Sequence, residues 1–82
     1  MLKIGKQTTL DREVVIDRAA KFFGKNGEGL EEMERNPCCI SFEGVGGYVL
    51  VSIVDNEDGK KRTVDVETRE FEYQAKRFLE AV

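Results

Sequence analysis

The hydrophobic and polar positions of the chain change their period near residue 38. Residues 10–23 carry apolar side chains at helical spacing, and the same spacing returns over residues 71–82. Between these segments apolar and polar residues alternate, which is the pattern of a half-buried strand. The chain is therefore predicted to have an amphipathic helix near each end and strands in between.

Threonine and glycine residues mark the expected ends of the two helices. Thr8 and Thr9 offer a side-chain oxygen as the N-cap of the first helix, and Gly24 or Gly27 would end that helix. Thr68 is placed to cap the last helix.

Three strands are predicted in the alternating region, over residues 38–43, 48–54 and 61–67. The glycine-rich stretch 44–47 and the stretch 55–59 would form the turns between them. Connections this short join neighbouring antiparallel strands, so the three strands are expected to form a meander.

A single register places the apolar residues of these strands on one face. It pairs Phe42 with Val49 and Val51 with Val64, and a shift by one residue would move every side chain to the other face. The residues expected to share the buried face are Ile40, Phe42, Val49, Val51, Ile53, Val64 and Val66.

Two segments outside this region have weaker patterns. Residues 24–37 are predicted to be a connection, in which residues 30–35 form one or two helical turns with Leu30 and Met33 packed inward. Residues 2–7 alternate weakly and could add a short edge strand.

The predicted fold class is α+β, in a single domain of residues 1–82. It is an antiparallel meander of three strands, or four with the edge strand, with an N-terminal and a C-terminal helix packed on one face. The other face is mixed, and Tyr48 and Leu50 make it a candidate surface for a protein partner. It is otherwise solvated or covered by residues 28–35. Its expected members are Ser41, Glu43, Tyr48, Leu50, Ser52, Val54, Thr63, Asp65 and Glu67.

Composition and charge restrict the function classes. The net charge is −3, the pI is about 5.0 and no basic stripe is present, so nucleic-acid binding is not expected. No apolar run has the ~20 residues needed to span a bilayer, and the N-terminus lacks a signal-peptide core, so we expect a cytoplasmic protein. The high content of Lys, Arg and Glu, with one proline, predicts a thermostable protein.

The absence of histidine removes several kinds of active site. Ser-His-Asp and Cys-His nucleophiles and histidine-ligated zinc all require that residue. The 16 Asp and Glu residues leave an enzyme with carboxylate chemistry as a third hypothesis, but no catalytic residue stands out. We therefore do not expect an enzyme.

The order of a helix, three strands and a helix resembles that of double-stranded-RNA-binding domains. Those domains place lysines at the start of the last helix to hold RNA phosphates. Residues 67–72 carry three glutamates there instead and would repel phosphate. The resemblance is confined to topology, and RNA binding is not predicted.

The two cysteines, Cys38 and Cys39, are adjacent. Neighbours on a strand point to opposite faces, so Cys38 is expected on the core face and Cys39 on the other. Two thiolates cannot supply the four ligands of a structural zinc site. Free thiols without a metal are predicted, and a redox or thiol-reactive role is the alternative.

The stretch DNEDG, residues 55–59, is the strongest candidate for ligand chemistry. Calcium takes about 6–8 oxygen ligands, and Asp55, Asn56, Glu57 and Asp58 offer several in one loop. Three cations follow immediately, so weak binding at about 10⁻⁴–10⁻³ M is expected. The alternative is a turn in which Asp, Asn and Gly serve local hydrogen bonds and positive φ.

A second acidic run could complete that shell. It contains Glu28, Glu31, Glu32 and Glu34, which would join the loop if residues 28–35 fold near the hairpin tip. In size, acidity and element order the chain resembles a type of small α+β protein from thermophilic archaea that has an acidic calcium-binding pocket. That resemblance implies calcium as the ligand and assigns no individual ligand residue. The alternative for the glutamates is a solvated helical face.

Overall fold

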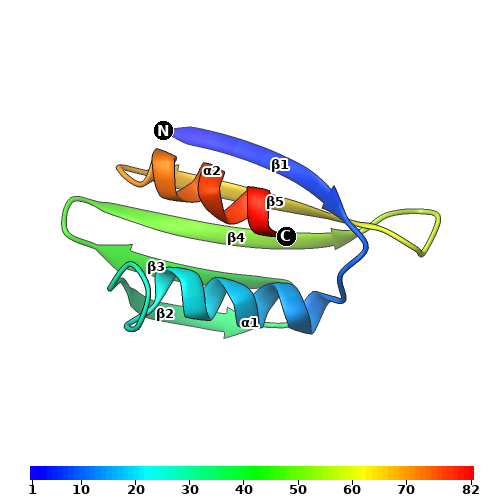
Figure 1. The fold of residues 1–82 in the computed structure, drawn as a ribbon, viewed down its shortest axis with the longest axis horizontal. Coiled ribbons are helices and arrows are strands. Elements are labelled where there is room, and N and C mark those ends of the chain that lie inside the picture. The colour runs from blue at the N-terminus through cyan, green and yellow to red at the C-terminus, as the bar shows by residue number, and fades with distance from the viewer.

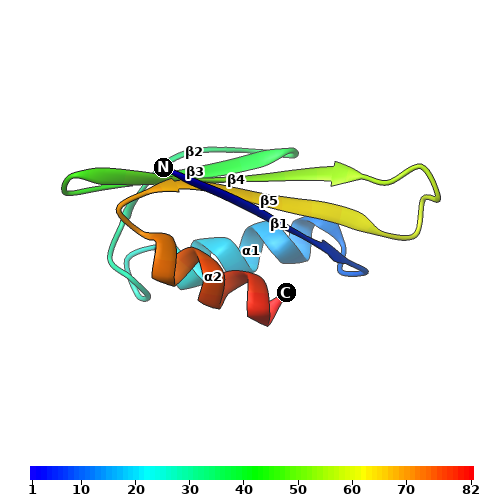
Figure 2. The ribbon, with the colours of Figure 1, turned by 90° about the horizontal axis from the view of Figure 1, so that it is seen from above.

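The computed structural model describes residues 1–82 as one α+β fold with a five-stranded antiparallel sheet (Figure 1). The strand order is β1-β5-β4-β3-β2, and both helices lie on the same face of the sheet (Figure 2). The α+β class is confirmed, with five strands in place of three or four. In chain order the elements are β1 (Leu2–Thr8), α1 (Arg12–Phe23), β2 (Glu31–Asn36), β3 (Cys39–Gly44), β4 (Gly47–Asp55), β5 (Arg62–Arg69) and α2 (Glu72–Ala81).

The core lies between the sheet and the two helices and contains 15 buried apolar residues. Phe23 of α1 connects the layers, because its ring centroid is 5.4 Å from that of Phe42 and 5.3 Å from that of Phe78. All seven apolar strand residues predicted to face the core are buried. Neither helix has the length and apolar content required to cross a membrane.

The predicted register is right for one strand pair and wrong for the next. Phe42 lies opposite Val49, as expected, but Val51 lies opposite Val66, not Val64. The β4–β5 ladder ends at Asp55, and the next backbone hydrogen bond joins Asn56 to the carbonyl oxygen of Lys61. The turn is therefore centred one residue later than predicted. The pairing shifts by two residues, which leaves every side chain on its predicted face.

Residues 30–35 do not form helical turns, so that prediction is wrong. They lie largely in the edge strand β2, whose backbone groups pair with β3. Gly29 has a φ of 81° and turns the chain into this strand. Leu30 is buried as expected and packs against Gly44, whereas Met33 sits at a β-bulge and is 54% exposed.

Neither predicted threonine cap forms. Thr68 lies in β5, buried, and its hydroxyl donates a hydrogen bond of 2.7 Å to the carbonyl oxygen of Tyr48. The helix α2 begins only at Glu72, after Glu70 turns the chain with a φ of 77°. At the first helix Thr8 Oγ1 accepts a hydrogen bond from the Leu10 amide, so it orders the turn before α1.

The weakly alternating N-terminal segment is an edge strand, as predicted. This strand, β1, pairs along its whole length with β5, and Ile4 lies opposite Val66. Its Lys6 side chain faces the helices and donates a hydrogen bond of 3.0 Å to the carbonyl oxygen of Leu79. The first and last elements of the chain are thereby joined at one edge of the fold.

Substitutions at Leu30 and Met33 test the structure of this segment. Leu30→Ala should lower the free energy of unfolding by about 2–5 kcal/mol, because it leaves a cavity in the core. Met33→Ala should change it by no more than about 0.5 kcal/mol, because the side chain is exposed. Urea denaturation measures both, and similar losses in the two variants would favour the helical turn over the strand.

Candidate functional site

The acidic stretch 55–59 forms the tip of the β4–β5 hairpin, and its polar side chains serve the turn. Asp58 Oδ1 accepts hydrogen bonds from the amides of Lys60 and Lys61, at 2.9 and 3.2 Å. These two N–H groups hold the pKa of Asp58 below its ordinary value. Asn56 Oδ1 accepts a hydrogen bond of 2.8 Å from the Thr63 hydroxyl. The turn interpretation therefore accounts for both residues.

Asp55 is held by two arginines at the base of the same hairpin. Its Oδ2 atom lies 2.8 Å from Arg12 NH2, and its Oδ1 atom lies 3.2 Å from Arg62 Nε. Arg62 also donates to the carbonyl oxygen of Leu10 at 3.1 Å. This carboxylate links the hairpin to the chain around the start of α1, and a cation bound there would have to compete with two guanidinium groups.

The predicted second acidic run lies elsewhere. Glu28 is in the turn after α1, and Glu31 and Glu34 are exposed on β2. Figure 1 shows this turn and the β4–β5 loop at opposite ends of the sheet. Across the sheet, Glu31 pairs with Glu43, and Glu43 pairs with Tyr48 of β4. Tyr48 and Asp55 are seven residues apart on β4, which is roughly 23 Å at ~3.3 Å per residue.

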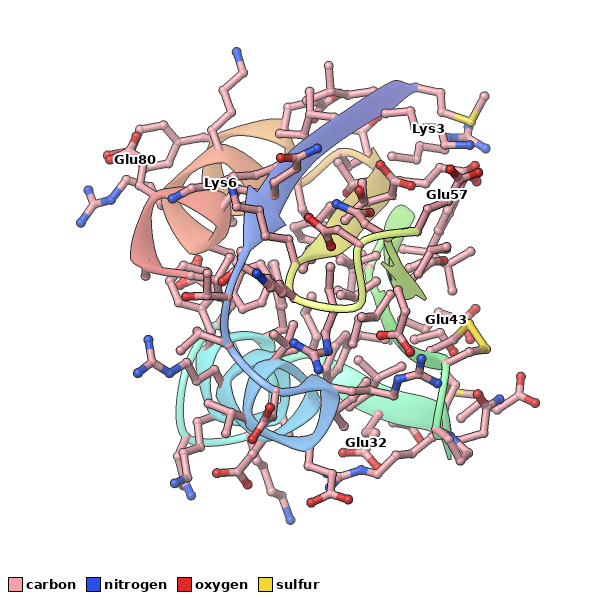
Figure 3. The ribbon with its side chains drawn as sticks, turned by 90° about the vertical axis from the view of Figure 1, so that its right-hand side faces the viewer. Lys3, Lys6, Glu32, Glu43, Glu57 and Glu80 are labelled. Carbon is pink, nitrogen blue, oxygen red and sulfur yellow. A yellow bond between two sulfur atoms is a disulfide. The ribbon has the colours of Figure 1, made fainter.

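The structure thus does not bring the two acidic runs together. Glu57, at the hairpin tip, has an exposed side chain that projects from the end of the molecule seen in Figure 3. No group of three or more Cys, His, Asp or Glu side chains is arranged to hold a metal ion. Weak calcium binding by the hairpin loop stays a prediction.

An open groove of about 1060 Å³ runs along α1 towards the β2–β3 turn and the end of β4. Only two of its 13 lining residues are apolar. Four of its cations are held in ion pairs. Arg12 and Arg62 bind Asp55. Lys21 Nζ lies 3.1 Å from Asp17 Oδ2, and Arg35 NH2 lies 2.7 Å from Glu32 Oε1. The groove lacks the apolar enclosure typical of small-molecule sites.

The open sheet face is the side of the sheet opposite the helices, and no other element covers it (Figure 2). Residues 28–35 do not rest on it, because β2 extends the sheet instead. In Figure 3, Lys3 and Glu43 project from this side, whereas Lys6 projects towards the helices. Tyr48 and Leu50 lie next to each other on it, on β4 at the centre of the sheet.

Tyr48 is oriented by its neighbours on the open sheet face. Its hydroxyl donates a hydrogen bond of 2.7 Å to Glu67 Oε2 and lies 3.2 Å from Met1 Sδ. The hydrogen bond to Glu67, which favours the protonated phenol, raises the pKa of Tyr48. Leu50 pairs with Ser41 on one side and Glu67 on the other. The two side chains form an apolar centre with one fixed hydroxyl.

Carboxylates outnumber cations around this centre. Glu31 of β2 lies directly opposite Glu43 of β3, which is an unfavourable pairing of like charges. The alternation of the strands places five acidic and two basic residues on the open sheet face. They are Glu31, Glu34, Glu43, Asp65 and Glu67, with Lys3 and Arg69. The surface therefore has a net negative charge.

The sequence predicts the centre of this surface but not its β2 margin. The strand period places Tyr48, Leu50, Glu43 and Glu67 on it. The same sequence favours a helical segment around Glu31, so it does not predict that Glu31 lies beside Glu43. The signals for a strand were Gly29 before this segment and the Asn36-Pro37 turn residues after it.

The two cysteines differ from their predicted state, because a disulfide joins Cys38 to Cys39 and no free cysteine remains. The prediction of free thiols assumed that both residues belong to a strand and point to opposite faces. Cys38 instead lies in the turn between β2 and β3 and is exposed, and only Cys39 belongs to β3. The turn brings the two sulfur atoms together.

The Asp58 turn predicts a specific dependence of stability on pH. Because its pKa is lowered in the folded state, the carboxylate stabilises the fold above its unfolded pKa of about 3.9, and this contribution is lost as pH falls through the folded pKa. Urea denaturation between about pH 6 and pH 2 should show a smaller loss for Asp58→Asn than for the native chain. Glu57→Gln is the control, because Glu57 makes no hydrogen bond in the loop. Equal pH profiles for the native chain and Asp58→Asn would contradict the role of this carboxylate.

Comparisons of the chain with protein-family models, with curated proteins and with solved structures gave no match.

Proposed function

We propose that the protein is an interaction module that binds a basic protein partner through its open sheet face. The observation that carries this proposal is an uncovered sheet surface with Tyr48 and Leu50 at its centre and carboxylates around them. Protein interfaces combine an apolar or aromatic centre with a polar rim. The expected partner therefore presents Lys or Arg around one or more apolar side chains.

Tyr48 and Leu50 would supply most of the binding energy. Tyrosine is enriched among the residues that dominate interfaces, and a ring held in place loses little conformational entropy on binding. The hydrogen bond from the Tyr48 hydroxyl to Glu67 fixes the ring before a partner arrives. Leu50 lies two residues further along the same strand, so a partner can contact both side chains at once.

The carboxylates would attract the partner and determine its charge. Glu31 and Glu43 repel each other across the β2–β3 pair, and a Lys or Arg placed between them would relieve that repulsion. Charge complementarity of this type raises the association rate and is weakened by salt. Two copies of the same acidic face would repel each other, so a basic partner fits better than a second copy of the chain.

Weak calcium binding at the hairpin loop is an alternative with less support. Asp55, Asn56 and Asp58 already use their side-chain oxygens in contacts with arginines, a hydroxyl and backbone amides. An enzyme with carboxylate chemistry also has less support, because the groove along α1 is open and four of its five cations are held in ion pairs.

Binding of a designed peptide tests the proposal. The probe is a peptide of alternating Lys and Leu, and its counterpart of alternating Glu and Leu is the charge control. Backbone amide NMR should show saturable shifts on β3, β4 and β5 with the basic peptide only, and these should weaken as salt is raised. Tyr48→Ala should reduce the affinity about tenfold or more, and Glu43→Lys should also reduce it.

Matched controls come from the helix layer. Tyr73 and Glu80 of α2 are exposed on the opposite side of the molecule, so Tyr73→Ala and Glu80→Lys should leave the affinity unchanged. Equal losses in the sheet and helix variants, or equal binding of the acidic peptide, would show that the peptide does not recognise the open sheet face.

A further inference from the structure

We propose that Cys38 and Cys39 form a thiol–disulfide exchange site that reacts with small thiols and disulfides of the glutathione class. Cys38 lies in the turn between β2 and β3 and Cys39 is the first residue of β3, and the structure holds the two as a disulfide. The disulfide is visible at the lower right of Figure 3, on the side of Glu43. This inference does not depend on the proposed partner binding.

The disulfide contributes little as a structural staple. A cross-link stabilises a fold mainly by restricting the unfolded chain, and this effect grows with the length of the closed loop. Here the two cysteines are consecutive, so the loop is as short as a disulfide loop can be. Reduction should therefore leave the fold intact, which is the property that a reversible site requires.

The backbone around the pair is held by the sheet and not by the sulfur atoms. The Ile53 amide donates a hydrogen bond of 2.8 Å to the carbonyl oxygen of Cys38, and Cys39 pairs with Ser52 of β4. On the other side Cys39 pairs with Asn36 of β2. These contacts are independent of the bond between the sulfurs, so both redox states fit the same turn.

Access and polarity favour reaction at Cys38. Cys38 is exposed, whereas Cys39 is half-buried in β3, so an external thiolate reaches the Cys38 sulfur more readily. Asn36 Oδ1 accepts a hydrogen bond of 3.1 Å from the Cys38 amide and lies 3.0 Å from Cys38 Sγ. Once the bond is reduced, the Cys38 thiol can donate to this same oxygen, so a polar partner for it is already in place.

The exchange balances in two steps. A small thiolate attacks Cys38 Sγ, the S–S bond breaks, and Cys39 leaves as a thiolate that takes up a proton. A second small thiolate then attacks the small-molecule sulfur of the mixed disulfide and releases Cys38. The protein disulfide gains two electrons and two protons, and two small thiols are oxidised to one small disulfide. Excess small disulfide drives both steps in reverse.

Alkylation in glutathione buffers tests the site. The native protein, equilibrated in buffers of reduced and oxidised glutathione and then labelled with a maleimide, should carry no label under oxidising conditions and two labels under reducing conditions. The change should follow a single two-electron transition that is reversible. Cys38→Ser and Cys39→Ser each retain one thiol and should take one label or form a mixed disulfide, with no internal bond.

Two further measurements separate an exchange site from a structural or inert pair. Amide NMR of the reduced protein should show shifts confined to residues 36–40 and 52–53, and the urea midpoint should be unchanged. Two labels at every glutathione ratio would overturn the proposal, because the thiols would then not pair. Reduction that requires urea, or that unfolds the protein, would also overturn it, because the disulfide would then be inaccessible or structural.

Discussion

The packing of Phe23 between the sheet and α2 is the interaction on which the rest of the structure depends. Its ring meets Phe42 of the sheet and Phe78 of α2, so one side chain holds three elements together. The two helices have only enough apolar surface to cover one face of five strands. The other face and the two edge strands are consequently left in contact with solvent. The open sheet face, where we propose that a partner binds, exists because both helices pack on the same side of the sheet.

The features that depend on side-chain period could be predicted from the sequence. Burial of alternate residues fixes the face on which Val51 and Val64 lie, and a register error of two residues does not change that face. Strand order and exact pairing could not be predicted, because they depend on contacts between distant segments. Residues 31–36 have few apolar side chains, and their strand conformation comes from hydrogen bonds to β3. Thr68 is a suitable cap by type, but it lies buried in β5, paired with Leu2 of β1 and Val49 of β4.

The candidate sites depend even more strongly on tertiary structure. Asp55 has the ligand type expected for calcium, yet the fold places Arg12 and Arg62 against it, and neither contact has a local sequence signal. The pairing of Glu31 with Glu43 likewise requires the β2–β3 register. Tyr48 and Leu50 can be identified from the sequence because both lie on one strand, where the alternation alone fixes their common face.

Stability and the proposed functions are carried by different parts of the molecule. The apolar helix layer holds the fold, and the side chains that face away from it are free of packing requirements. An opposed glutamate pair, which costs up to about 1 kcal/mol, is tolerated at this surface because the core does not depend on it. The same applies to a disulfide between consecutive residues, whose opening removes almost no restraint on the unfolded chain. The glutamate pair and the disulfide therefore contribute little or unfavourably to the stability of the fold. Both lie on or beside the open sheet face, where we propose that they serve binding and thiol exchange.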